Sequence, residues 1–133
     1  MKKYVLSLLA LAMGGCTLHN SPYRLAEVSL AKDGQPCVAV PADSMTKDRK
    51  SRLLVLRVSE RFADKQMHLV WQRDDMKNPT FIVQPGKCLP VQFQFEKGKE
   101  YSVNAITAFS AREVETKRIW STSFTLEKLA NKK

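Results

Sequence analysis

The three cysteines of this chain are the residues whose type and spacing indicate possible chemistry. The first, Cys16, follows a lysine pair at 2–3, an apolar run over 4–13 and two glycines. A basic start, a short apolar run and small residues at the cleavage point are typical of a bacterial secretory signal. A cysteine directly after the small pair is typical of a lipoprotein signal, so we expect residues 1–15 to be removed and the Cys16 thiol to carry diacylglycerol. The alternative is an ordinary signal peptide in which this cysteine has no role.

The other two cysteines are expected to form a disulfide. An odd number of cysteines in an exported chain leaves one thiol to explain, and lipid on Cys16 would explain it. Cys37 and Cys88 then remain as a pair, and the oxidising periplasm favours a bond between them. A metal pair or a redox site is the alternative, but the chain has no CxxC spacing and neither histidine lies near either cysteine in the sequence. Closure of a loop of about 50 residues would stabilise the fold by roughly 4 kcal/mol.

The remaining candidates form no catalytic set. His19 lies in a polar segment, and His68 is expected on the solvent face of a strand. Asp74 and Asp75 precede Asn78 in a stretch with the composition of a turn. The sequence holds no HExxH or GxSxG motif and no glycine-rich phosphate loop. We therefore expect a protein that is not an enzyme and that holds no metal or cofactor.

The organisation is that of one domain behind a short tether. Removal of residues 1–15 leaves 118 of 133 residues, the size of one ordinary domain. The apolar run of about ten residues is too short for the roughly 20 that cross a membrane as a helix. Residues 16–22 predict a lipidated tether that reaches about 20 Å when extended. We expect the domain over 23–127 and a basic, frayed tail over 128–133.

The sequence of the domain predicts short strands separated by turns. Strands are predicted over 26–30, 37–40, 53–59, 65–72, 80–84, 91–96, 101–109 and 120–126. In the 65–72 strand, Met67, Leu69 and Trp71 are predicted to share the apolar face, and Trp71 and Trp120 are expected in the core. The pattern predicts an all-β fold, an immunoglobulin-like antiparallel β-sandwich of about seven strands. A small β-barrel is the alternative.

The mature chain carries a surplus of positive charge. Without the two signal lysines, 20 basic side chains stand against 13 acidic ones. This surplus either serves solubility or favours an acidic protein partner or anionic headgroups, whereas nucleic acid does not suit an exported chain without a basic-aromatic motif. The densest basic cluster lies on a polar loop that is either solvated or a contact for an acidic partner. Its members are Lys47, Arg49, Lys50 and Arg52.

Six short motifs together resemble a known family. They are the signal ending at Cys16, SPYRLAEVSL at 21–30, CVAVP at 37–41, PGKCLP at 85–90, FEKGKEYSV at 95–103 and WSTSFTL at 120–126. In this order, and over most of the mature chain, they resemble the type VI secretion immunity periplasmic lipoproteins of enteric bacteria. The residues that match are Cys16 as the lipid site and Cys37 with Cys88 as the pair. Met13 departs from the leucine that is commonest at its position.

The resemblance implies an anchored antidote. Such a protein binds and neutralises a type VI secretion effector in the periplasm, through a tight interface of roughly 1,600 Å². Thr17, in place of an aspartate after the lipid site, implies sorting to the outer membrane, on the side that faces the periplasm. The family offers no motif for a toxin-binding site. The alternative functions are a structural or assembly lipoprotein of the envelope and a lipoprotein that inhibits lysozyme.

Overall fold

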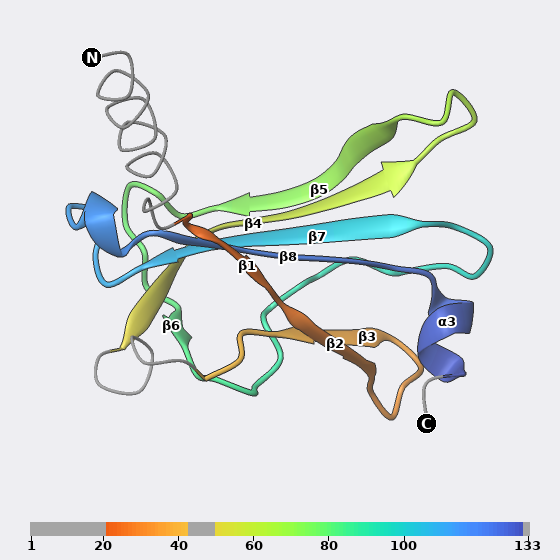
Figure 1. The fold of residues 1–133 in the computed structure, drawn as a ribbon, viewed down its shortest axis with the longest axis horizontal. Coiled ribbons are helices and arrows are strands. Elements are labelled where there is room, and N and C mark those ends of the chain that lie inside the picture. The colour runs from red at the N-terminus through yellow and green to blue at the C-terminus, as the bar shows by residue number, and fades with distance from the viewer. Residues whose placement is uncertain (1–20, 43–49, 132–133) are drawn as a thin grey trace, which may run out of the picture.

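Stretches rich in Leu, Val, Ile and Thr form the long strands of one sheet. The computed structural model describes residues 21–42 and 50–131. The central strand, β4 (Ser51–Arg61), lies between β5 (Met67–Asp74) and β7 (Tyr101–Ala108). This larger sheet has the order β1-β8-β7-β4-β5, and β6 (Ile82–Val83) pairs with the beginning of β4 (Figure 1).

The edge opposite β5 contains the parallel pair of the sheet. There β1 (Tyr23–Leu25) runs parallel to β8 (Arg118–Phe124), while the other pairs named above are antiparallel. The chain then leaves β1 and enters a second layer. This edge adds one parallel pair to the predicted antiparallel sandwich, because β1 and β8 enter the sheet from the same end.

A smaller layer packs against the larger sheet. It begins with a hairpin of β2 (Glu27–Leu30) and β3 (Pro36–Ala39), which turns at Gly34 with a positive φ of 81°. The segment 88–96 completes this smaller layer. The predicted all-β sandwich is confirmed, and the described strands form no closed barrel.

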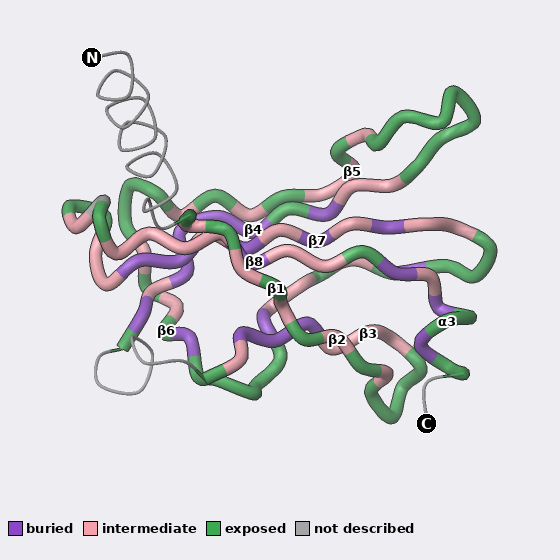
Figure 2. The backbone as a smooth tube through the Cα atoms, viewed as in Figure 1, coloured by how far each residue is buried: buried purple, intermediate pink, exposed green. Residues whose placement is uncertain are grey.

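The core lies between the two layers. Trp120, Val103 and Leu56 of the larger sheet are at most 2% exposed, and Val38 of β3 faces them from the smaller layer. Four aromatic rings, those of Phe93, Phe95, Tyr101 and Phe124, meet at one end of this core with centroids 4.8–6.1 Å apart. Figure 2 shows the buried stretches concentrated in β4 and β7.

A β-bulge overturns the predicted face of β5. Val58 of β4 pairs with Trp71, but the next residue, Ser59, pairs with Leu69, so Val70 is an extra residue. Val70 and Trp71 both pack against the core, whereas Leu69 is 53% exposed. The strict alternation that placed Met67 and Leu69 on the apolar face was therefore wrong.

The predicted frayed tail begins as a helix. Residues Leu126–Ala130 form α3, and the Thr125 hydroxyl caps it by accepting a hydrogen bond from the backbone N–H of Lys128 at 3.1 Å. Leu126 and Leu129, three positions apart, are both buried on one face of the helix. The chain therefore stays packed through Leu129, and the predicted strand 120–126 ends at Phe124.

Candidate functional site

The predicted disulfide is present and joins two elements of the smaller layer. Cys37 lies in β3, and its Cα atom is 5.1 Å from that of Cys88, 51 residues later. Next to the disulfide, the Leu89 N–H donates to the Val38 carbonyl at 2.7 Å. The disulfide therefore stands where the chain after β6 meets the free edge of β3.

The segment 91–96, predicted as a strand, has the alternating side-chain exposure of a strand but no backbone pairing with a neighbouring strand. Val91, Phe93 and Phe95 face inward while Gln92 and Gln94 are exposed, which is the alternation of an extended chain. This segment is nevertheless not assigned as a strand. The prediction was right about which side chains of this segment face the core and wrong about its pairing as a strand.

One side chain takes the place of the missing ladder. Gln35, just before β3, donates from Nε2 to the Phe95 carbonyl at 3.3 Å and accepts from the Phe95 N–H at 2.8 Å through Oε1. A primary amide thus makes the two hydrogen bonds that the peptide of a neighbouring strand would make. Residue 35 was not singled out from the sequence, because a glutamine after a turn carries no signal of a partner 60 positions away.

The backbone of residues 92–94, between the disulfide and the Gln35–Phe95 bonds, is open. No described residue forms a hydrogen bond with the backbone N–H of Gln92, Phe93 or Gln94. Peptide groups two positions apart in an extended chain point to the same side, so the N–H and C=O of Phe93 point as those of Phe95 do, toward β3. On β3, Val38 directs its carbonyl to this side, and Pro36 does the same by the same rule.

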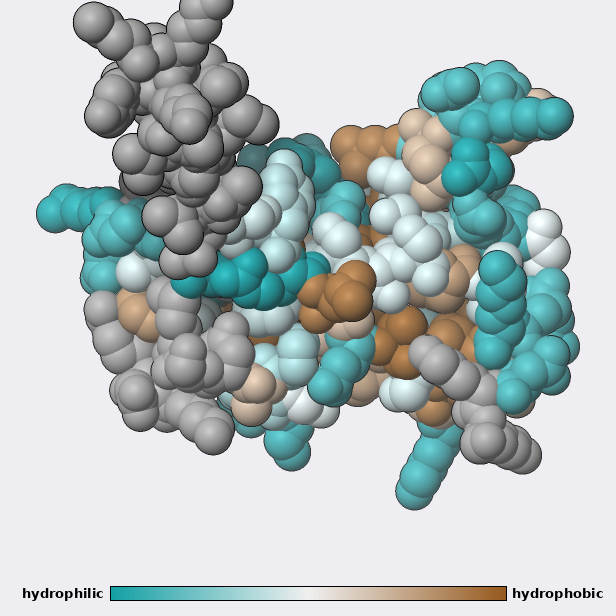
Figure 3. Space-filling model, viewed as in Figure 1, coloured by the Kyte–Doolittle hydropathy of each residue, from teal (hydrophilic) through white to brown (hydrophobic). Residues whose placement is uncertain are grey.

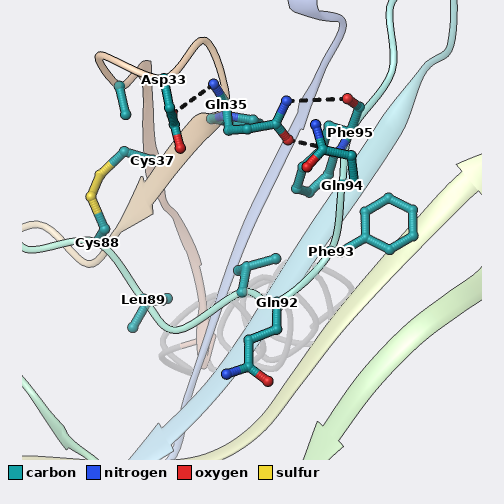
Figure 4. A pocket seen from close by; sticks show the side chains of 12 residues that line it. Asp33, Gln35, Cys37, Cys88, Leu89, Gln92, Phe93, Gln94 and Phe95 are labelled. Atoms are coloured by element: carbon teal, nitrogen blue, oxygen red, sulfur yellow. Dashed lines mark hydrogen bonds between the residues drawn. A yellow bond between two sulfur atoms is a disulfide. The ribbon is translucent and has the colours of Figure 1, made fainter.

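These walls enclose a groove of about 560 Å³, which we call the disulfide groove. Figure 4 shows the disulfide on one side and the Gln35–Phe95 bonds on another, with Leu89, Gln92 and Phe93 on the chain that joins Cys88 to Phe95. A groove with unpaired main-chain donors and acceptors can bind an extended segment of another protein as an added strand. It offers recognition by hydrogen bonds and shape.

Two of the four residues of the predicted basic cluster lie within the described part of the chain. Lys47 and Arg49 lie outside the described residues, as does Cys16. Lys50 is exposed, whereas Arg52 is half-buried and donates from Nη1 to the Pro79 carbonyl at 3.2 Å. Arg52 therefore has a structural role in holding the loop before β6.

His68 lies near the beginning of β5, and the paired carboxylates lie where β5 ends. His68 stacks on the Phe62 ring with centroids 4.4 Å apart, and its Nε2 lies 2.7 Å from Asp64 Oδ2. The Gln66 N–H, and then His68, lower the pKa of the Asp64 carboxyl below its ordinary 3.8. Asp74 accepts from the Met76 N–H in the turn that the sequence predicts. Within residues 21–42 and 50–131, no three His, Cys, Asp or Glu side chains gather as a metal site.

Comparison with family models gives one match, which covers residues 23–129. The family is described as a domain of unknown function, DUF7480. The chain belongs to the DUF7480 family. No curated protein and no solved structure matches the chain. The DUF7480 match begins at the first residue of β1 and ends inside α3, so both layers and the disulfide groove belong to the family domain. None of the helices in the described part is both long and apolar enough to cross a bilayer.

Proposed function

We propose that this DUF7480 protein is a lipid-anchored immunity protein of the periplasm, without enzymatic activity, that binds and neutralises a type VI secretion effector. The observation that carries the proposal is the combination in one chain of the signal ending at Cys16 with the five motifs that follow it. The lipid would hold the protein on the periplasmic side of the outer membrane, where an incoming effector must be met. A tether raises the local concentration of the antidote at that surface.

The disulfide groove supports the proposal as a place of contact. Three of the motifs that carry the resemblance meet there, since Cys37 belongs to CVAVP, Cys88 to PGKCLP and Phe95 to FEKGKEYSV. The groove combines open peptide groups with a wall fixed by a covalent bond. A preorganised wall loses little conformational entropy on binding, which favours tight association. We propose that an extended segment or loop of the effector enters this groove.

The experiment that tests the function uses the protein encoded by the neighbouring reading frame. That protein is directed to the periplasm of a host cell with and without the full-length lipoprotein, and cell survival is counted. We expect killing without the lipoprotein and survival with it, together with a stoichiometric complex on size-exclusion chromatography. Equal killing in both cells would contradict the immunity function. Capture of cell-wall or secretion-apparatus proteins alone would favour an assembly lipoprotein, and inhibition of lysozyme would favour the inhibitor alternative.

A paired variant tests the groove separately. Gln92→Arg with Gln94→Arg places two bulky cations on the rim, and both side chains are exposed, so folding should be retained. Gln66→Arg is the matched control, because Gln66 is exposed on the β4–β5 hairpin and its described hydrogen bonds involve only its backbone. We expect the groove variant to weaken the complex at least tenfold, which is about 1.4 kcal/mol, and the control to bind as the unmodified protein does. Unchanged binding by the groove variant would place the effector elsewhere.

A further inference from the structure

The two most exposed large apolar side chains of the described chain lie on one short strand. Leu25 is 83% exposed and Tyr23 is 65% exposed, and both belong to β1. Residues two positions apart on a strand share a face, so these side chains project together. Isolated exposed apolar residues are common on protein surfaces, but a pair on one edge strand beside a tether calls for an explanation.

The pair points away from the smaller layer. Arg24, between them, is in register with buried Trp120 and therefore lies on the core side of the sheet. Tyr23 is in register with Ile119 and Leu25 with Ser121, on the outer face. Tyr23, Leu25 and half-buried Ile119 form what we call the β1 patch. Figure 3 shows a brown area over β1 beside teal surface, and the disulfide groove belongs to the other layer.

The length of chain before β1 limits how far this patch can lie from the lipid. Seven residue steps separate Cys16 from Tyr23. A fully extended chain covers at most about 3.6 Å per residue, so the patch lies within roughly 25 Å of the lipid attachment point. That distance is similar to the width of a small domain. The tether therefore keeps the outer face at β1 close to the membrane.

An excess of positive charge lies at the same end of the domain. We call residues 21–24, 50–56, 73–80 and 105–120 the tether end, because the strand register aligns β1 with the beginning of β4 and β8 and with the end of β5 and β7. The tether end holds eight basic and four acidic side chains, while the rest of the described chain holds eight and seven. Basic side chains close to an anionic bilayer are attracted to its phosphates.

We propose that the β1 patch docks on the anionic membrane surface, with Tyr23 and Leu25 at headgroup depth and the basic tether end against the phosphates. The proposal rests on the lipid anchor of the proposed function and adds an orientation to it. Tyrosine favours the membrane interface because its ring is apolar and its hydroxyl is polar. In this orientation the disulfide groove faces the periplasm, where an effector can reach it.

The test places a fluorescent reporter on each edge of the larger sheet. Lipidated protein carrying Leu25→Trp is reconstituted in phosphatidylglycerol vesicles that contain a doxyl-labelled lipid. Leu69→Trp is the matched control, since Leu69 is 53% exposed on β5 at the opposite edge. We expect quenching at position 25 to exceed that at position 69 by about threefold. The native Trp71 and Trp120 contribute the same background to both variants.

The outcomes separate this proposal from the lipid anchor. Protein that does not float with the vesicles contradicts the anchor, and this proposal with it. Floating protein with equal quenching at both positions contradicts only the docking of the β1 patch. A second measurement uses the mature chain without lipid, exported behind an unrelated signal. We expect Tyr23→Ser with Leu25→Ser to weaken its binding to phosphatidylglycerol vesicles by about tenfold, with no effect of Met67→Ser with Leu69→Ser. Equal loss in both pairs would overturn the proposal.

Discussion

The two layers of this sandwich are held together by different kinds of bond. In the larger sheet, β4 pairs along most of its length with β5 on one side and β7 on the other, through backbone ladders. Among the described residues of the smaller layer, only β2 and β3 form a ladder. The segment 88–96 is attached by a disulfide, an isolated bridge at Cys88 and the amide of Gln35.

The two kinds of bond leave different numbers of peptide groups available to a partner. A ladder uses up the peptide groups of both strands, so the larger sheet keeps few of them for a partner except at its edges. A covalent bond and one side-chain amide fix the smaller layer at two points, and the N–H groups of residues 92–94 between them have no partner in the described chain. The smaller layer can therefore be well defined in shape and still offer main-chain groups for recognition. Five sets of substitutions test this difference between the two layers.

Removal of the disulfide is expected to have the largest effect. Cys37→Ala with Cys88→Ala should lower the free energy of unfolding by about 4 kcal/mol, because the unfolded chain gains the entropy of a loop of 51 residues. Urea denaturation measures the loss. Hydrogen exchange should show that the Leu89 amide loses protection first while the Val103 amide in β7 keeps it. Equal loss at both amides would mean that the layers open as one unit.

A change inside the larger sheet is expected to destabilise both layers together. The Trp120 Nε1–H donates to the Thr107 hydroxyl at 2.9 Å, and both residues are 2% exposed. Trp120→Phe should cost about 3 kcal/mol through the lost volume and the unpaired hydroxyl. Thr107→Val is the companion variant, since it keeps the volume and removes only the hydrogen bond. Thermal unfolding should remain a single transition in both variants, and a separate early transition would contradict this expectation.

Gln35 is the smaller layer's substitute for a ladder. Gln35→Ala leaves the N–H and C=O of Phe95 without their partner and should cost about 2 kcal/mol. Gln92→Ala is the control, because Gln92 is exposed and its side chain has no hydrogen bond within the described chain. Chemical denaturation of the two variants gives the comparison. A loss in Gln35→Ala no larger than in Gln92→Ala would show that the disulfide alone holds the segment.

The Tyr101 hydroxyl connects the layers and makes stability depend on alkaline pH. It accepts from the Glu96 N–H at 2.9 Å, and burial raises the pKa of Tyr101 above its ordinary 10.0. Above about pH 10 the unfolded chain loses this proton first, so the free energy of unfolding falls as pH rises toward the folded-state pKa. Tyr101→Phe should cost about 1 kcal/mol at neutral pH and lessen the alkaline decline. Denaturation at pH 7 and at about pH 11 tests this, and an unchanged decline would be inconsistent with it.

The smallest effect belongs to the exposed hairpin of the larger sheet. The Gln66 N–H is the main cause of the lowered pKa of Asp64, and His68 is the second. A lowered pKa stabilises the fold above the ordinary value of 3.8, and the contribution is lost as pH falls through the folded-state pKa. His68→Ala should move the Asp64 titration only part of the way back, as followed by carboxyl NMR shifts. Complete restoration would mean that the turn hydrogen bond to Gln66 has no effect.

Local pattern was enough for the strands and the disulfide. Alternation of apolar and polar residues gave strands that match β2, β7 and β8, because a half-buried strand leaves a period of two in the sequence, and short apolar runs gave those that match β3 and β4. The pairing of Cys37 with Cys88 followed from counting thiols in an exported chain. These inferences depend on composition and spacing, which a sequence carries in full.

Only the tertiary structure decided which strands pair and what remains open. The bulge at Val70 turned Leu69 outward, and the parallel contact of β1 with β8 brought residues 23–25 beside 119–121. The Gln35 side chain bonds the peptide of Phe95, 60 positions later. The Phe93 peptide, two positions before Phe95, faces the groove without such a partner among the described residues. The physical reason is that pairing and register are set by contacts between distant segments. The chain itself determined the strands and the cysteine pair, whereas the groove and the β1 patch exist only in the folded domain.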